Sequence, residues 1–303
     1  MPREGRERPV ASVVIPAHNE ATVLGRLLDA LRSGVEPGQL EVVVACNGCT
    51  DDTAAVAREH GATVVEIGAP SKMAALTAAD AVATVFPRCY IDADVVVTGG
   101  AVMEVVRLLA DPDARCAAPQ VRFDLTERPW AVRAYHVAYL RDPYLSEEHV
   151  GSGFYALSEQ GRRELARFPE LLQLLTTARY QPPAEDLFVR NLFTRAQRRV
   201  GPEPFVIQAP RTLRTLLRRR IRMFRANREL SAHPDFRTLP GTREYGFGHW
   251  SRKMLLVPPC QLPGTIVYMT VDIVARIAAR WPSRGPRPVE WGRDHTTRTS
   301  VSG

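Results

Sequence analysis

The first 120 residues alternate short apolar runs with amphipathic segments, and this alternation limits the chain to a small set of folds. Five runs rich in valine, isoleucine, alanine or cysteine follow one another: ASVVI, EVVVAC, ATVVEI, CYI and CAAPQV. Continuous apolar runs of this kind are typical of strands that are buried on both faces. Repeated strand–helix units with short connections predict an α/β fold, in which a mostly parallel, Rossmann-like sheet carries helices on both faces.

Capping residues indicate where the intervening helices begin and end. Valine and leucine recur at helical spacing over residues 23–31, and Asn19 precedes them as a candidate N-cap. Thr50 and Ser71 hold the same place before the next two helices. Gly61 follows the second helix, as a glycine at a helix C-terminus would.

Polar residues gather at the carboxyl ends of the predicted strands. PAHNE follows the first strand, CNGCTDDT the second, and an aspartate pair, Asp92 and Asp94 of YIDADVVV, the fourth. Each has an ordinary structural explanation by itself, as a helix cap, a turn or an acidic first helical turn. Ligands bind open parallel sheets at this edge, so their joint occurrence predicts a binding site. The two aspartates also need an arginine, solvent or a metal ion to compensate their charge.

The motifs that are absent narrow the class of ligand. No G-x-G-x-x-G follows the first strand and no G-x-x-x-x-G-K-[ST] occurs, which disfavours a Rossmann dinucleotide site and a P-loop. A nucleotide diphosphate can instead be held by acidic and amide side chains, with Mg²⁺ or Mn²⁺ between carboxylate and phosphate oxygens. Asp94 is placed to be a ligand of that cation.

Charge and cysteine content limit the partners and the compartment. The formal net charge is +7 and comes from arginine, since Lys72 and Lys253 are the only lysines. No zinc-finger, RNP or basic-zipper pattern accompanies this charge, so an anionic small substrate or a membrane surface is expected rather than nucleic acid. The five cysteines lie mostly in apolar runs, and the N-terminus has no apolar signal segment. Both features predict a cytoplasmic protein, and peripheral contact with the inner face of the membrane stays open.

The order of the short motifs resembles glycosyltransferase family 2, whose members have the GT-A fold. VVIPAHNE is similar to the family's first strand and loop, NGCTDDT to its second loop and YIDADV to its D-x-D motif. PSKMAAL is similar to its lysine-containing segment, GSGFYALS to its glycine-rich segment and AEDLF to its E-D motif. The resemblance extends over residues 12–228. It implies a metal-dependent transferase that moves a sugar from a nucleotide-diphosphate donor to an acceptor hydroxyl.

The resemblance also implies roles for residues on the donor side. Asp92 is implied to contact the ribose side, and Asp94 the metal and the diphosphate. Asn47 stands where many members have aspartate, and uridine is still the expected base. The further residues implied to surround the nucleotide or its diphosphate are Pro16, Ala17, Glu20, Asn47, Lys72, Arg222 and Arg225.

On the acceptor side, the resemblance implies that Asp186 is the base that takes the proton of the acceptor hydroxyl. Adjacent helical residues point about 100° apart, so Glu185 is the alternative base and otherwise caps the helix or pairs with an arginine such as Arg190. The Q-x-x-R-W motif of processive synthases is missing, which favours a non-processive transferase. Inversion at the anomeric carbon is expected, with a glycan, a lipid-linked or a small-molecule acceptor. The residues implied to line this side are Gly151, Ser152, Gly153 and Glu185.

Two other functions stay open. A sugar nucleotidyltransferase has a related α/β architecture, but it carries a glycine-rich G-x-x-x-R-L-type loop where this chain has PAHNE. An inactive homologue that senses sugar nucleotides or serves as a scaffold is the other alternative. The joint presence of Asp92, Asp94 and Asp186 argues against it.

An arginine-rich helix is expected after Pro210. The residues expected on its buried face are Leu213, Leu216, Leu217, Ile221 and Phe224. The arginines expected on its outer face are Arg218, Arg222 and Arg225. Contact with the diphosphate or with an anionic membrane is as well supported as simple solvation.

A second, apolar stretch near the C-terminus is interrupted by prolines, Asp272 and Arg276, which disfavours a membrane-spanning helix. Its second half is amphipathic. One face carries Ile266, Met269, Ile273 and Ile277, and the other carries Tyr268, Asp272, Arg276 and Arg280. The helix either packs against the domain or lies in a membrane interface with Trp281 as an anchor.

These patterns divide the chain into four segments. Residues 1–10 are expected to be flexible, and residues 11–230 to form the GT-A domain. Within that domain, residues 11–120 are the nucleotide-binding half and residues 121–230 the acceptor half. A C-terminal extension over 231–281 and a disordered tail over 282–303 are expected to follow.

Overall fold

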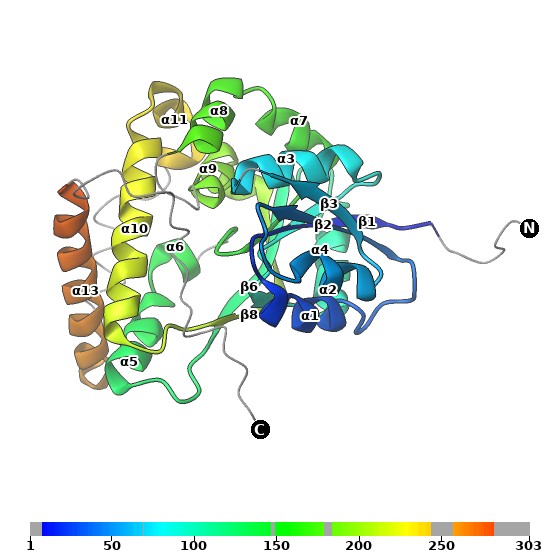
Figure 1. The fold of residues 1–303 in the computed structure, drawn as a ribbon. Coiled ribbons are helices and arrows are strands. Elements are labelled where there is room, and N and C mark those ends of the chain that lie inside the picture. Colours follow the sequence, from blue (N-terminus) through cyan, green and yellow to red (C-terminus); the bar gives the residue numbers. More distant parts are fainter. Residues whose placement is uncertain (1–7, 69, 147–148, 179–183, 244–256, 282–303) are drawn as a thin grey trace, which may run out of the picture.

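The structure is a computed structural model that describes residues 8–68, 70–146, 149–178, 184–243 and 257–281. A sheet of eight strands crosses the centre of this described part in the order β3-β2-β1-β4-β7-β6-β8-β5 (Figure 1). Its strands are β1 (Ala11–Ala17), β2 (Leu40–Asn47), β3 (Thr63–Ile67), β4 (Arg88–Ile91), β5 (Val95–Val96), β6 (Cys116–Asp124), β7 (Phe154–Leu157) and β8 (Arg198–Gln208). The five apolar runs of the sequence correspond to β1, β2, β3, β4 and β6.

Most neighbouring strands of the sheet run parallel. β1 pairs in parallel with β2 and β4, β2 with β3, and β6 with β8. β7 is antiparallel to β4 and β6, and β5 is antiparallel to β8. The predicted α/β fold with a mostly parallel sheet is therefore confirmed. The antiparallel β7 brings the glycine-rich segment that precedes it next to the carboxyl end of β4.

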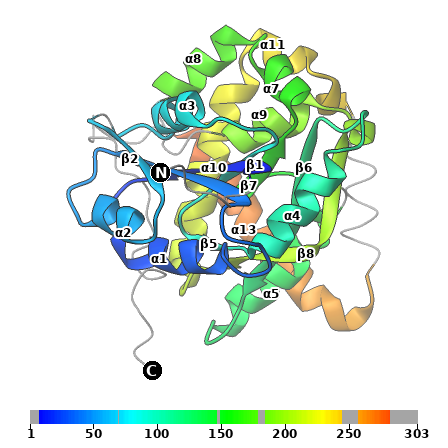
Figure 2. The same ribbon diagram turned by 90° about the vertical axis from the view of Figure 1, so that its right-hand side faces the viewer.

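Helices cover both faces of the sheet, as predicted. Side chains alternate along β1, so that Val14 joins a core cluster with α3 and α8 while Val13 and Ile15 join a second cluster with α1 and α4. Figure 2 shows α3 and α8 on one side of the sheet and α1 on the other. The helices are α1 (Ala21–Ala30), α2 (Thr53–Glu59), α3 (Lys72–Val82), α4 (Gly99–Leu108), α5 (Trp130–Tyr139), α6 (Pro143–Ser146), α7 (Glu159–Leu165), α8 (Pro169–Thr177), α9 (Glu185–Leu192), α10 (Leu213–Ser231), α11 (Pro234–Thr238) and α13 (Leu262–Arg280).

The N-termini of the first helices differ from the prediction in two of three cases. The N-cap of α1 is Glu20 rather than Asn19, and the N-cap of α2 is Asp52 rather than Thr50. The side chain of Asn19 instead accepts a hydrogen bond from the backbone N–H of Thr50, at 2.6 Å. The two predicted caps thus tie the first two strand-end loops together. Ser71 is the N-cap of α3, as predicted.

The connection from α2 to β3 is partly as predicted. Gly61 follows α2 with φ +74°, the left-handed conformation expected of a glycine at this place. β3 lies at the edge of the sheet and is half exposed, so the expectation that it is buried on both faces is wrong. An edge strand has a neighbour on one side only, and its apolar run does not reveal this.

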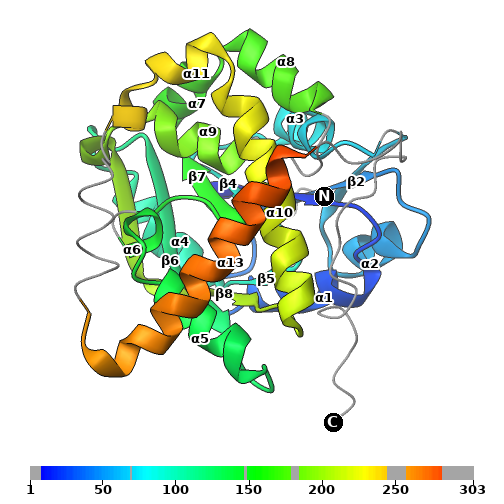
Figure 3. The same ribbon diagram turned by 90° about the vertical axis from the view of Figure 1, so that its left-hand side faces the viewer.

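A layer of three helices, α5, α10 and α13, lies on the side of the molecule away from α1 and α2 (Figures 1 and 3). α13 is the outermost of the three and packs against α5 and α10. Its two predicted faces are found only in part: Tyr268 and Asp272 are buried, but Arg276 and Arg280, expected on the same face, are exposed. Met269, expected with the isoleucines, packs against the buried cluster instead. Ile266 and Ile273 are 62% and 51% exposed. An apolar face of α13 therefore remains uncovered by the described residues.

Buried polar contacts fix this orientation of α13. Arg220 of α10 forms a bidentate ion pair with Asp272, with Nε–Oδ1 at 2.9 Å and Nη2–Oδ2 at 2.6 Å. The hydroxyl of Tyr135 donates to Asp272 at 3.1 Å, and that of Tyr268 donates to Asp142 at 2.6 Å. A buried charge without its partner is strongly destabilising, so the polar side of α13 must face α10 and α5.

The arginine-rich helix α10 also differs from the prediction. Leu216 and Phe224 are buried as expected, and Arg218 is exposed as expected. Leu213, expected on the buried face, is 42% exposed at the start of the helix. Arg220, not expected on the buried face, lies there together with Leu216 and Phe224, because α13 supplies a carboxylate for it.

By length and composition, the segment Pro259–Arg280 could cross a membrane, with a mean hydropathy of 1.4 over its best window. Helices buried in the core of soluble proteins meet the same criterion, so this is weak evidence by itself. The expected disordered tail (282–303) and most of the expected flexible N-terminus (1–7) lie outside the described residues.

Candidate active site

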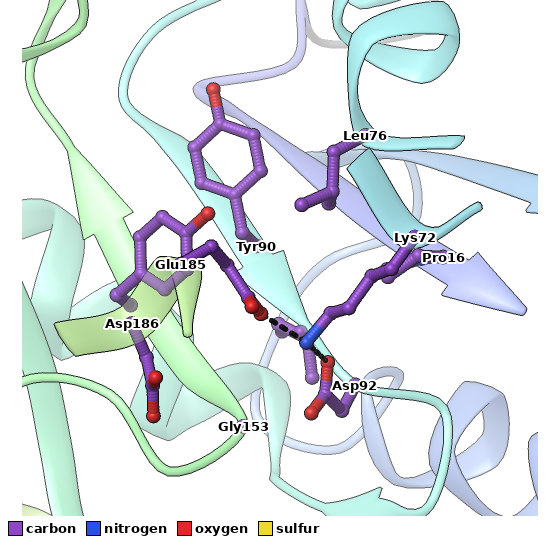
Figure 4. Close-up of a pocket in the computed structure, with 10 residues that line it drawn as sticks. Pro16, Lys72, Leu76, Tyr90, Asp92, Gly153, Glu185 and Asp186 are labelled. Atoms are coloured by element: carbon purple, nitrogen blue, oxygen red, sulfur yellow. Dashed lines mark ion pairs between the residues drawn. The ribbon is translucent and has the colours of Figure 1, made fainter. Parts of the chain in front are cut away.

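A cleft opens at the carboxyl end of β4, where β1, β7, α3 and α9 also meet (Figure 4). These elements come from both halves of the predicted GT-A domain. The residues that line the cleft are Pro16, Lys72, Leu76, Tyr90, Ile91, Asp92, Gly153, Tyr155, Glu185 and Asp186. Six of these were predicted as site residues from the sequence: Pro16, Lys72, Asp92, Gly153, Glu185 and Asp186.

Lys72 lies at the centre of the charged groups in the cleft. Its ammonium group pairs with Asp92 at 2.6 Å and also with Glu185, as the dashed lines in Figure 4 show. The side chains of Lys72 and Glu185 are 10% and 5% exposed, whereas that of Asp92 is 33% exposed. Glu185 was expected to pair with an arginine such as Arg190, but the partner that the structure shows is Lys72. The lysine joins the end of β4 to the start of α9.

Burial and neighbouring charges shift the proton affinities of this pair. Burial by itself would lower the pKa of Lys72, but Asp92 and Glu185 outweigh it and raise that pKa above its ordinary value. Burial raises the pKa of Glu185 to about 7, against the opposing charge of Lys72 and with the support of Asp186 and Asp92. Three carboxylates thus share the cleft with one lysine. When they ionise, the cleft is negatively charged and attracts cations.

The segment 151–153 passes between two of the carboxylates. Gly151, Ser152 and Gly153 have φ values of +126°, +58° and +105°, a region that favours glycine. A Cβ on Gly151 would lie 2.9 Å from Cβ of Asp186, and one on Gly153 would lie 3.4 Å from Oδ2 of Asp92. The backbone N–H of Ser152 donates to Asp186 at 3.1 Å, and that of Asp92 donates to the carbonyl of Gly153 at 2.8 Å. The small loop therefore positions both aspartates.

Glu185 and Asp186 point to different sides, as their helical spacing predicts. In Figure 4 the carboxylate of Glu185 is directed at Lys72, and that of Asp186 points away from the lysine. Glu185 is buried, whereas Asp186 is half-buried. Asp186 is therefore the more accessible of the two to an incoming hydroxyl group.

Two tyrosines of the cleft were not predicted as site residues. The rings of Tyr90 and Tyr155 stack with their centroids 4.9 Å apart. The hydroxyl of Tyr90 donates to Asp80 at 2.7 Å, and Asp80 also pairs with Arg88 and Arg162. Both tyrosines lie inside the motifs YIDADV and GSGFYALS. Strand alternation places Tyr90 on the same face as Asp92, which is a signal that could have found it.

The other predicted donor-side residues lie at the ends of β1 and β2. Ala17, Glu20 and Asn47 are buried. The side-chain Nδ2 of Asn47 donates to the carbonyl of Ala17 at 2.8 Å, which links the two strand ends. Among the described residues, no group donates a hydrogen bond to Oδ1 of Asn47. Contacts of these residues with a nucleotide stay a prediction.

Asp94, Arg222 and Arg225 do not line the cleft. Asp94 lies two residues beyond Asp92, immediately before β5, and is half-buried. Arg222 and Arg225, expected on the outer face of α10, are half-buried, and Arg225 donates to the carbonyl of Trp281 at 3.2 Å. Their contacts with a metal ion and a diphosphate stay predictions.

A separate group of possible metal ligands lies outside the cleft. Glu170, His233 and Asp235 offer ligand atoms within 4.8 Å of one another, at the start of α8 and around the start of α11. Glu170 is exposed and the other two are half-buried. Exposed acidic groups are common without a bound ion, so we assign no role to this group.

The fold and the cleft agree with the comparison to known families. The family model of glycosyl transferase family 2 matches residues 12–166, which is more than half of the chain. The chain therefore belongs to glycosyl transferase family 2, and its fold is GT-A. The match covers β1 to β7 and ends before α9, so Glu185 and Asp186 lie beyond it.

The match to an individual curated relative extends over a short part of the chain. The chain resembles a 4,4'-diaponeurosporenoate glycosyltransferase of Staphylococcus aureus (strain MRSA252), with 43% identity over 56 residues. That match covers 18% of this chain and 14% of the relative, so this chain accounts for a small part of that protein's length.

Two solved structures match the chain. A mannosyltransferase from Pyrobaculum calidifontis, solved with GDP-Man and Mn²⁺, has a TM-score of 0.54 at 20% identity, over 89% of this chain and 76% of that one. Glucosyl-3-phosphoglycerate synthase from Mycobacterium tuberculosis, solved with Mn²⁺, UDP and glucosyl-3-phosphoglycerate, has a TM-score of 0.46 at 22% identity, over 74% and 79%.

Proposed function

We propose that this protein transfers a sugar from a nucleotide-diphosphate donor to an acceptor hydroxyl, in a metal-dependent, inverting and non-processive reaction. The observation that carries the proposal is the cleft in which Asp92, Lys72, Glu185 and Asp186 meet. Family membership supports glycosyl transfer as the reaction class. The structure supports separate donor and acceptor sides of this cleft. Asp92 and Lys72 come from the predicted nucleotide-binding half, and Glu185 and Asp186 come from the predicted acceptor half.

Asp94, with Asp92 beside it, is proposed to hold a divalent cation, Mg²⁺ or Mn²⁺. Hard carboxylate oxygens suit either cation. Asp94 lies outside the cleft but two residues from Asp92, so the carboxylates of the adjoining cleft, which outnumber its lysine, also favour a cation there. When bound, such a cation neutralises the diphosphate and stabilises its departure. The mannosyltransferase of similar fold was solved with Mn²⁺, which is consistent with this assignment.

Asp186 is proposed to accept the proton of the acceptor hydroxyl as the sugar is transferred. Its carboxylate is half-buried, points away from Lys72 and is held by the N–H of Ser152. A hydroxyl group attacks readily only when a base within hydrogen-bond reach takes its proton. Glu185, paired with Lys72, is proposed to fix the lysine and Asp92 in place rather than to act as the base.

The nucleobase is proposed to be uracil. Oδ1 of Asn47 lacks a donor among the described residues, and a ring N–H would satisfy it. Because Asn47 is fully buried, the loop after β2 must open for a base to reach this oxygen. Uracil and guanine have such a group between two polar substituents, whereas adenine and cytosine do not. Guanine is therefore the base against which uracil must be tested.

The experiment compares donor binding with and without Mn²⁺ by thermal unfolding. A ligand that binds only the folded protein raises its melting temperature, so UDP-sugars should do so in wild type and only with Mn²⁺. Asp94→Asn should lose this metal-dependent rise, and the exposed Asp113→Asn should retain it. A larger rise with GDP-sugars would reject uracil. An equal rise of both variants in metal-free buffer would reject the metal site.

A further inference from the structure

The exposed large apolar side chains are concentrated on one side of the described part of the chain. Nine of the eleven belong to α5, α10 and α13 or directly follow α13, and only Val10 and Val82 lie elsewhere. Five of the nine lie on α13, and we call them the α13 apolar face: Leu262, Ile266, Ile273, Val274 and Ile277. Exposed apolar patches of this kind mark surfaces that bind an apolar partner.

The exposure of the α13 apolar face is fixed by the packing beneath it. A helix that served only to cover the domain would turn its isoleucines inward. Here the bidentate pair of Arg220 and Asp272, and the bond from Tyr268 to Asp142, occupy the inner side instead. Turning α13 to bury its isoleucines would break these buried contacts, which is strongly unfavourable.

The charges around the α13 apolar face are of one sign. Every exposed charged residue of α5, α10 and α13 is an arginine, including Arg276 and Arg280 on α13 itself. The acidic residues of these three helices are Asp272, which is buried, and Glu229, which is half-buried. The partner of this surface should therefore be apolar in part and negatively charged.

We propose that this surface binds an anionic lipid bilayer, with α13 lying in the interface along the membrane plane. Isoleucines with flanking arginines are typical of interfacial helices. Trp130 at the start of α5 and Trp281 after α13 are 65% and 64% exposed, and tryptophan prefers the level of the lipid headgroups. A spanning α13 would instead place Asp272 and Arg276 in hydrocarbon and separate Asp272 from Arg220.

A second copy of the chain fits this surface less well. In a symmetric dimer the same patch faces itself, so its arginines would lie opposite arginines. An anionic lipid surface attracts all of them at once. The proposal depends on the surface alone, and it holds whether or not the protein transfers a sugar.

The first arm of the experiment tests the apolar contact by sedimentation of the full-length protein with vesicles of phosphatidylcholine and phosphatidylglycerol. Ile266→Ser/Ile273→Ser removes two side chains that support no core, so thermal unfolding should be unchanged. The partition onto vesicles should fall by about tenfold or more, because each apolar group that enters the interface adds to binding. Val10→Ser/Val82→Ser, exposed elsewhere on the molecule, should bind as wild type.

The second arm tests the charge. Arg214→Gln/Arg218→Gln on α10 should weaken binding, while Arg26→Gln/Arg107→Gln on other surfaces should change it less. Binding of the wild type should fall as the salt concentration rises, because exposed charges are screened. Replacing phosphatidylglycerol by phosphatidylcholine throughout should have the same effect.

Three results would overturn the proposal. Equal vesicle binding by the wild type and by Ile266→Ser/Ile273→Ser would exclude the α13 apolar face as the contact. Equal binding to neutral and anionic vesicles would exclude the role of the arginines. A wild-type dimer in sedimentation velocity that dissociates in Ile266→Ser/Ile273→Ser, with no vesicle binding, would assign the surface to a second copy.

Discussion

Glu185→Gln should change how the stability of the metal-free protein depends on pH. The pKa of Glu185 is about 7 in the folded protein against 4.5 ordinarily, so between these values the folded state holds a proton that the unfolded chain releases. The contribution of this carboxyl group to the free energy of unfolding is therefore fully present below about pH 4.5, and it is lost as the pH rises to about 7. At about 1.4 kcal/mol per pH unit, the loss over this window is about 3 kcal/mol.

The assay is urea unfolding of wild type and Glu185→Gln at several pH values without divalent cations. Carboxylates outside the cleft titrate equally in both proteins, so the free-energy difference between them reports Glu185 together with the cleft charges that interact with it. The wild type should become less stable relative to Glu185→Gln as the pH rises. Glu159→Gln is the control, because Glu159 is exposed and pairs with Arg163, one helical turn further along α7. A pH-independent difference between wild type and Glu185→Gln would refute the reasoning about the buried, negatively charged cleft.

Two further substitutions test the packing of α13 and of the glycine loop. Asp272→Asn leaves the buried guanidinium of Arg220 without its counter-ion and should lower the free energy of unfolding by about 3–5 kcal/mol. Arg220→Met/Asp272→Leu removes both charges and should restore most of this loss. Equal stability of the single and double variants would contradict this expectation. Gly151→Ala brings a methyl group within 2.9 Å of Cβ of Asp186 and should reduce sugar transfer at least about tenfold by displacing that carboxylate. Gly61→Ala has a similarly positive φ but nothing within 4 Å, so it should cost stability and leave transfer intact; equal losses of transfer would reject the positioning role of Gly151.

The sequence predicts the sheet well because its signals are local. The apolar runs from 11 to 120 correspond to strands, and the loops that follow β1, β2 and β4 fall at one edge of the sheet because parallel strands share their carboxyl ends. The edge position of β3 and the antiparallel direction of β7 depend on which strands become neighbours, and periodicity does not contain that information.

Within the site, the short motifs indicate which residues gather but not how they pair. Lys72 and Glu185 were both predicted as site residues, yet their ion pair was missed, because the two lie on helices far apart in the sequence. Arg220 was overlooked for the same reason, since a buried arginine is expected only when its partner is known. The amphipathic pattern of α13 grouped the exposed isoleucines correctly but placed Met269, Arg276 and Arg280 on the wrong faces, because the choice of the buried face depended on the pair of Arg220 and Asp272.

The central claim is that Asp186 is the base for sugar transfer, and it is tested most directly by the rate of transfer in Asp186→Asn. The measurement is release of the nucleoside diphosphate from saturating donor with Mn²⁺ and a panel of acceptor alcohols, with donor affinity measured in parallel. Loss of a general base typically lowers the rate about 10²- to 10⁴-fold, so Asp186→Asn should do so at nearly unchanged donor affinity, with a smaller loss in Glu185→Gln. A rate near that of the wild type in Asp186→Asn would contradict the account.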